Sequence, residues 1–155
     1  MKVTFAPRGI LQIDDARIVY RNFSGVGSKF NREGDRNFSV VIDDPALADQ
    51  LMQEGWNVKV RPPREEFGDE VPFMHLPVKI KFGDRGPAVY LITGGRKNEL
   101  DEESIGCLDD IDILGVDLDI RPYDWEVNGK TGRTAYLQAI HVTQEVDRFA
   151  MRYED

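Results

Sequence analysis

Residues that could form a metal site or a covalent framework are scarce in this sequence of 155 residues. It contains one cysteine, Cys107, and two histidines, His75 and His141. A single cysteine excludes an internal disulfide framework, and these few ligands do not suit a classical zinc site. Neither histidine is near Cys107 in sequence, so we expect Cys107 to be a small buried hydrophobic residue. We therefore predict neither a metal nor another cofactor.

Long apolar runs are also missing. No stretch of 18 consecutive apolar residues exists, and the first residues, MKVTFAPRG, lack the apolar core of a signal peptide. There is no repeat, low-complexity tract or interdomain linker. The hydrophobic fraction of 41% and the aromatic fraction of 10% are those of a folded protein. We therefore expect residues 1–155 to form a single cytosolic domain with its own core and no membrane contact.

The net charge of −8 is unevenly distributed along the chain. Residues 98–120 contain nine carboxylates and no lysine or arginine. Removing these nine from the 28 acidic residues leaves 19 acids against 20 bases. Because binding follows the local potential rather than the net charge, an acidic total does not exclude a nucleic-acid partner.

Residues 113–142 have the pattern of a long hairpin. In the first arm, Val116, Leu118 and Ile120 alternate with charged residues, which is typical of a half-buried strand. The second arm, residues 133–142, is again apolar and extended. Between the arms, Asn128-Gly129 favours a tight turn, and the second glycine, Gly132, predicts a slightly longer loop with a bulge.

The tip of this hairpin combines aromatic and basic residues. Arg121, Tyr123 and Trp125 have the parity opposite to the buried positions, so we expect them to project away from the core, beside Lys130 and Arg133. Exposed aromatics beside cations can stack bases while phosphates are neutralised. Two alternatives stay open: the aromatics could fill the core or a sheet edge, and Pro122 could introduce a bulge that exchanges the two faces.

A second hairpin is predicted over residues 16–43, with a glycine-rich basic loop at its tip. Further basic residues lie on two other predicted strands, residues 56–61 and 76–82, the second of which alternates strictly. The predicted nucleic-acid-binding residues in full are Arg17, Arg21, Lys29, Phe30, Arg32, Arg36, Lys59, Arg61, Lys79, Lys81, Arg121, Tyr123, Trp125, Lys130 and Arg133.

The remaining pattern indicates a mainly β protein. Asp44-Pro45 is a strong helix start, with a capping side chain followed by proline, and Gly55 is its stop. We expect no regular structure over residues 2–9, a strand over residues 88–93, a basic turn at residues 94–97 and an acidic helix from residue 98. Seven or eight strands, several joined as hairpins, and two short helices favour a closed or partly closed antiparallel barrel.

The order of these motifs resembles a known family. The strand, basic loop and return over residues 16–43 are similar to the opening hairpin of bacteriophage single-stranded-DNA-binding proteins. The block Arg121-Pro122-Tyr123-Asp124-Trp125, followed by residues 128–132 and Ala135-Tyr136-Leu137, resembles their closing hairpin. This resemblance implies an OB fold that coats single-stranded DNA during phage replication and recombination, with phage replication or recombination proteins as further partners. Many members end in a long acidic tail, whereas here only Glu154 and Asp155 close the chain.

Two rival interpretations remain. A metal-dependent nuclease could use clustered carboxylates, because hard cations take oxygen ligands; the candidates are Asp109, Asp110, Asp112, Asp117 and Asp119. No lysine or histidine lies near them in sequence to act as a base, so we expect no catalysis. The other interpretation is a phage structural or adaptor protein, a class that is also β-rich and acidic. The sequence leaves the oligomeric state open, as monomer or dimer.

Overall fold

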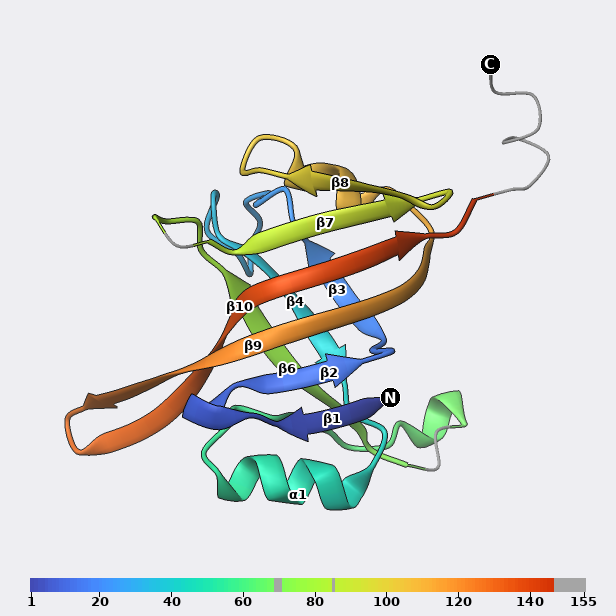
Figure 1. Cartoon of the computed structure of the whole chain (residues 1–155). Coiled ribbons are helices and arrows are strands. Elements are labelled where there is room, and N and C mark those ends of the chain that lie inside the picture. Colours follow the sequence, from blue (N-terminus) through green and yellow to red (C-terminus); the bar gives the residue numbers. More distant parts are fainter. Residues whose placement is uncertain (69–70, 85, 147–155) are drawn as a thin grey trace.

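The computed structural model describes residues 1–68, 71–84 and 86–146 (Figure 1). Within these ranges the chain forms ten strands, one α-helix and three short 3-10 helices. The strands are β1 (Lys2–Phe5), β2 (Leu11–Asp14), β3 (Ile18–Asn22), β4 (Arg36–Val41), β5 (Lys59–Arg61), β6 (Phe73–Ile80), β7 (Ala88–Thr93), β8 (Arg96–Leu100), β9 (Ile113–Val127) and β10 (Lys130–Gln144). The helices are α1 (Pro45–Gln53), η1 (Pro7–Gly9), η2 (Glu65–Phe67) and η3 (Ile105–Asp109). None of the helices that the structure describes has the length and apolar character needed to span a bilayer.

All ten strands belong to one sheet, whose main path runs β1-β2-β9-β10-β6-β4-β3. β10 is central because it pairs with β9 along one edge and with two strands along the other. It runs parallel to β6 at Ala135↔Val78 and Tyr136↔Lys79, and parallel to β7 from Ala139↔Ala88 onward. The expectation of a wholly antiparallel sheet was therefore wrong, because alternation along a strand carries no information about the direction of its partner. The path is also open, beginning at β1 and ending at β3, so it does not establish a closed barrel.

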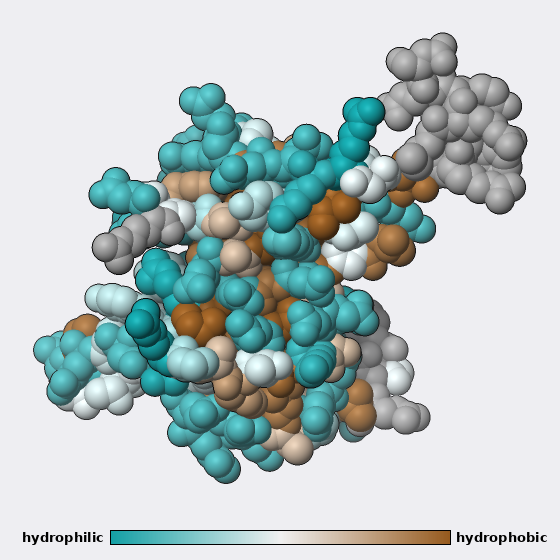
Figure 2. Space-filling view, viewed as in Figure 1, coloured by the Kyte–Doolittle hydropathy of each residue, from teal (hydrophilic) through white to brown (hydrophobic). Residues whose placement is uncertain are grey.

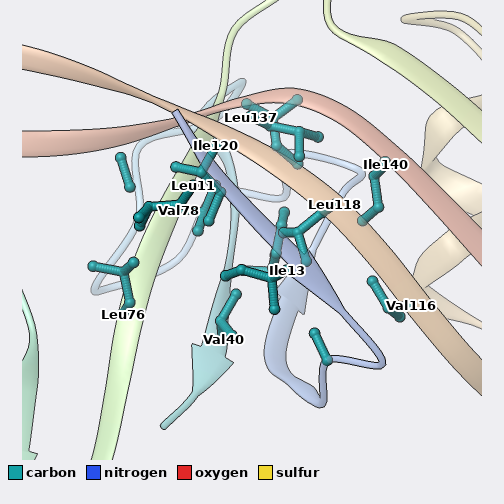
Figure 3. Packing of buried hydrophobic residues seen from close by; sticks show 14 of the residues in the cluster. Leu11, Ile13, Val40, Leu76, Val78, Val116, Leu118, Ile120, Leu137 and Ile140 are labelled. Atoms are coloured by element: carbon teal, nitrogen blue, oxygen red, sulfur yellow. The ribbon is translucent and has the colours of Figure 1, made fainter. Parts of the chain in front are cut away.

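The core lies on the inward face of this sheet (Figure 3). Val116, Leu118 and Ile120 of β9 are buried, as their alternation predicts, and so are Leu76 and Val78 of β6. On β6 the outward positions between them include His75 and Pro77, which are only half-buried. The inward and outward sides of β9 and β6 are thus fixed by burial of the apolar set.

The β9–β10 hairpin is confirmed, and its tip extends beyond the rest of the sheet (Figure 1). Val127 pairs with Lys130, so the turn contains only Asn128 (φ 51°) and Gly129 (φ 80°). Positive φ at both positions is the signature of a type I′ turn. The prediction of a longer loop at the tip was therefore wrong. Gly132 has another role, because it lies directly opposite Trp125 and a Cβ there would overlap the indole ring.

The predicted helix is confirmed as α1. Asp44 Oδ1 accepts a hydrogen bond of 3.0 Å from the Ala46 N–H, and Pro45 occupies the first turn. Gly55 follows the helix with φ 91°. Ala48 and Leu51 are buried, which attaches α1 to one end of the sheet beside β1 (Figure 1).

Three local expectations were wrong. Residues 2–5 form β1, which pairs with β2; the short stretch gives little periodicity, and the pairing depends on a partner strand. The turn expected at residues 94–97 is confined to Gly94 (φ 55°) and Gly95 (φ 83°), which reverse the chain and place β8, residues 96–100, against β7. The helix expected from residue 98 begins only at Ile105, as the 3-10 helix η3 that ends at Asp109. Cys107 is exposed, not buried as expected. Partial burial of its thiol, and secondarily the negative charge of Asp110, raises the pKa of that thiol.

Arg21 and Asp109 fasten η3 to β3. Nη1 of Arg21 donates to the carbonyl oxygens of Leu108 and Ile111, each at 2.8 Å. Asp109 in turn accepts from the backbone N–H groups of Phe23 at 2.7 Å and Ser24 at 2.9 Å. These hydrogen bonds satisfy backbone groups at both ends of the contact, so Arg21 stabilises the fold.

Replacing Arg21 should therefore weaken the fold more than replacing its neighbour Arg17, an exposed arginine just before β3. Arg21→Met removes charged donors from two carbonyls and should cost about 1.5–3 kcal/mol of unfolding free energy. Arg17→Met should change it by less than about 0.5 kcal/mol. Urea denaturation of the two variants measures both values. Equal stability of the two would contradict this role of Arg21.

Candidate nucleic-acid interface

One row of side chains crosses the outward face of the sheet from β9 to β4. Arg121 pairs with Tyr136, Tyr136 with Lys79, and Lys79 with Asn37. Neighbouring strands lie about 4.8 Å apart, so these four residues are adjacent in space. The guanidinium carbon of Arg121 lies 5.0 Å from the centre of the Tyr136 ring. We call Arg121, Tyr136, Lys79 and Asn37 the central row.

The central row borders two hollows in the surface. The first has a volume of about 560 Å³ and is lined by Asn37, Lys79 and Tyr136, with Lys81 beside them. The second, of about 670 Å³, is lined by Lys81 and Arg121. Since Lys81 borders both, the two hollows are neighbours, and we call them together the central groove. Its walls also include three acidic residues: Asp35, Asp84 and Glu102.

The hairpin tip continues the same face. Arg121, Tyr123 and Trp125 are exposed, which confirms the predicted parity, and Pro122 does not exchange the faces. Residues opposite each other in a ladder share a face, so these three lie with residues 130, 132, 134 and 136 of β10. Within residues 121–136 this face carries no carboxylate. Tyr123 also meets Tyr136 edge to face, with ring centres 5.9 Å apart.

Trp125 is less open to a ligand than Tyr123. Its ring rests on Gly132 and is 38% exposed, against 54% for Tyr123. It also borders a separate hollow of about 470 Å³, whose walls include three carboxylates: Glu54, Asp124 and Glu126. The central groove also has three acidic residues, but four cations line it against one, Arg133, here, so a phosphate near Trp125 would meet less positive charge.

Arg133 lies on the other face of the hairpin. Its Nε donates to Asp124 Oδ1 at 2.7 Å and its Nη2 to Asp124 Oδ2 at 3.3 Å. The hydrogen bond from Arg133 lowers the pKa of Asp124. The guanidinium carbon also lies 5.3 Å from the ring of Trp56, which is buried. The charge of Arg133 is thus already paired, away from the central row.

The basic loop between β3 and β4 adds a further exposed aromatic, Phe30. Phe30 is 91% exposed, and Lys29 Nζ lies 5.7 Å from its ring centre. Asn31 holds the loop together, because its amide nitrogen donates to the carbonyls of Val26 at 3.0 Å and Asp35 at 2.9 Å. Asn31 also lines the central groove. Lys29, Phe30 and the exposed Arg32 therefore stand beside that groove.

Two predicted arginines, Arg17 and Arg21, do not join this face, and a third, Arg36, borders the central groove but is held by Glu102. Arg17 and Arg21 line a different hollow of about 560 Å³, whose acidic wall residues are Asp15, Asp43, Asp112 and Glu145. Arg36 lies 3.6 Å from a carboxylate oxygen of Glu102 and donates to its backbone carbonyl at 3.2 Å. The side chains of Arg21 and Arg36 thus make contacts within the protein. Lys59 and Arg61 lie on β5, which pairs with the other end of β6.

Two of the carboxylates considered for a nuclease, Asp109 and Asp117, accept hydrogen bonds from backbone groups. Asp109 caps the β3 end as described above, and Asp117 Oδ1 accepts a hydrogen bond of 2.8 Å from the Asp15 N–H. Burial, and secondarily Asp14, raises the pKa of Asp119. Among the residues that the structure describes, no group of three or more histidine, cysteine or acidic side chains could hold a metal ion.

Sequence reasoning left Tyr136 and Asn37 out of the site. A signal for Tyr136 was present: a two-residue turn at Asn128-Gly129 fixes the ladder, and counting back from it pairs Arg121 with Tyr136. Asn37 had no such signal, because its neighbourhood depends on β6 pairing with β4 on one edge and β10 on the other.

Comparisons with known proteins identify a matching family and similar folds. Residues 2–155 match the model of a family described as "Putative phage ssDNA-binding domain". Three solved structures of a single-stranded-DNA-binding protein from bacteriophage Enc34 have a similar fold. The C-terminal truncation has a TM-score of 0.54 at 14% identity, covering 95% of this chain and 97% of that chain.

The Enc34 complex with single-stranded DNA has a TM-score of 0.53 at 13% identity, covering 95% and 93% of the two chains. The third structure has a TM-score of 0.52 at 15% identity, covering 100% and 97%. No curated protein matches this sequence.

The contact between Trp125 and Gly132 gives a test of the hairpin geometry. Gly132→Ala places a Cβ where the indole ring lies, so the ring must move, and unfolding free energy should fall by about 1–3 kcal/mol. In a Trp56→Phe background the emission of Trp125 should shift to longer wavelength. Thr131→Ala, next in sequence, should leave the emission unchanged. An unaltered spectrum in Gly132→Ala would contradict the contact.

Proposed function

The chain belongs to the family of phage single-stranded-DNA-binding domains, and we propose that it coats and protects single-stranded DNA through the central groove. The observation that carries this proposal is the central row, in which a tyrosine lies between an arginine and a lysine on an open sheet face. The role in phage replication follows from the family; a role in recombination belongs to the proposal.

The chemistry of the central groove suits a strand of any sequence. A base stacked on Tyr136 or Tyr123 gains about 1–3 kcal/mol whichever base it is, because every base has a π-face. Lys79, Lys81 and Arg121 can neutralise the phosphates on either side, which releases counterions. Duplex reading normally uses a helix in the major groove, whereas the α-helix of the described chain packs its buried side against the sheet.

Other predicted residues extend this surface. Lys29, Phe30 and Arg32 stand beside the central groove on the basic loop, and Trp125 and Lys130 continue it toward the hairpin tip. We propose that a bound strand contacts both. The arginines at positions 17, 21, 36 and 133 are assigned to contacts within the protein or to its acidic hollow, as their geometry supports.

We further propose that the chain works as one domain without catalysis, in the cytoplasm of the infected host. The match over residues 2–155 supports a single domain, and membership of a DNA-binding family supports a role without bond cleavage. The likeness in fold to the Enc34 structures supports an arrangement related to the OB fold.

A phage structural or adaptor protein is the alternative. Such proteins dock through large apolar patches, but the face shown in Figure 2 is mostly hydrophilic, with hydrophobic residues in small separate areas. DNA binding that weakens steeply with added salt would favour the DNA-binding function, whereas weak binding even at low salt would favour the adaptor.

Replacing Tyr136 tests the proposal most simply. Tyr136→Ala should weaken binding of fluorescent oligothymidylate by about 1–3 kcal/mol, through loss of one stacking platform. Tyr90→Ala is the matched control: Tyr90 is also half-buried beneath a cation, with Lys97 Nζ 4.2 Å from its ring centre, but it lies on β7.

Tyr90→Ala should leave DNA affinity unchanged. Thermal melting of both variants checks that each remains folded. Equal losses of affinity in the two variants, or tighter binding of duplex than of single strands by the unaltered protein, would contradict the proposed function.

A further inference from the structure

A second aromatic cluster lies at the other end of β6, away from the central row. Tyr20 of β3 meets His75 edge to face at 5.3 Å between ring centres and Phe73 at 6.3 Å. Phe73 and His75 are themselves 5.4 Å apart. Tyr20 is 58% exposed, so the rings form an open surface. We call Tyr20, Phe73 and His75 the Tyr20 cluster.

Two cations of β5 converge on this cluster. Lys59 pairs with His75 and Arg61 with Phe73, and the guanidinium carbon of Arg61 lies 4.9 Å from the Phe73 ring centre. Nε of Arg61 is buried without a hydrogen-bond partner among the described residues. Burial, with Lys59 and Arg61 as further causes, lowers the pKa of His75. The positive charge at the cluster therefore comes from Lys59 and Arg61, while the lowered pKa favours the neutral form of His75.

The backbone at Tyr20 is strained. Its φ is +54°, within β3, where the ladder to β4 shifts between Val19 and Asn22. A bulky residue in this region costs of order 1–3 kcal/mol and such residues gather at functional sites. Burial of the side chain offers little compensation, because more than half of Tyr20 is exposed. The strained conformation brings the ring across β4 onto β6, where it completes the cluster.

β6 connects the cluster with the central row. His75, Pro77 and Lys79 alternate with buried residues, so they share the outward face. Lys79 is four positions after His75 along the strand, which is about 13 Å at 3.3 Å per residue. We propose that the Tyr20 cluster is a second base-stacking subsite for the same DNA strand, with Lys59 and Arg61 contacting the adjacent phosphates. This inference rests on the proposed function and adds that the bound DNA strand runs along β6.

Binding as a function of strand length tests the second subsite. Oligothymidylates from about 4 to about 16 nucleotides span the usual site sizes of single-strand-binding modules. Tyr20→Asn removes the ring and keeps a residue that tolerates positive φ. It should match the unaltered protein on the shortest oligonucleotide that binds and bind longer ones about 5- to 100-fold more weakly. Arg61→Gln should show the same dependence on length.

Tyr136→Ala separates this inference from the proposed function, because it should weaken binding at every length. Unchanged affinity of Tyr20→Asn and Arg61→Gln at all lengths, with Tyr136→Ala still weakened, would overturn the second subsite alone. A loss that is equal at all lengths would also overturn it. Failure of the unaltered protein to bind any length would overturn both. If thermal melting shows that Tyr20→Asn is unfolded, the length dependence of binding by Arg61→Gln decides whether the second subsite exists.

Discussion

The ladder between β9 and β10 is the constraint on which the proposed interface depends. The turn at Asn128-Gly129 fixes its register, and a slip by one residue would turn every side chain of a strand to the opposite face. With this register the exposed aromatics and Arg121 share one side, while Asp124 and Arg133 pair on the other. Burial of Val116, Leu118 and Ile120 enforces the same choice from the core side. Turn chemistry and hydrophobic burial therefore together determine which side chains lie on the proposed interface.

The cations of this acidic protein divide into two groups by what they contact. Arg21, Arg36 and Arg133 donate to carbonyls or carboxylates of the protein itself, so these side chains stabilise the fold. Lys79, Lys81 and Arg121 border the central groove on the open sheet face. A net charge of −8 is thus compatible with DNA binding because the carboxylates lie largely elsewhere, and because the local potential governs association.

Much of this arrangement could be predicted from sequence, because period-two alternation reports burial directly. The hairpin of β9 and β10, the inward side of β6 and the capped start of α1 all follow from local patterns. Strand partners do not: β10 pairs in parallel with β6 and β7, and this pairing brings Tyr136 beside Lys79. The contacts of Arg21 and Arg36 could not be predicted either. An arginine that donates to a carbonyl distant in sequence has the same sequence pattern as an exposed arginine. The strained backbone of Tyr20 also has no sequence signature, because a tyrosine in a strand ordinarily has negative φ.

The central claim is that single-stranded DNA lies on the outward face of β10 and β6. Photocrosslinking of bound oligothymidylate, followed by mass spectrometry of the peptides, locates the strand directly. The account predicts adducts at Tyr136 and Tyr123, with none on β7 or β8. Adducts confined to β7 and β8, or to the acidic hollow around Arg17, would contradict it.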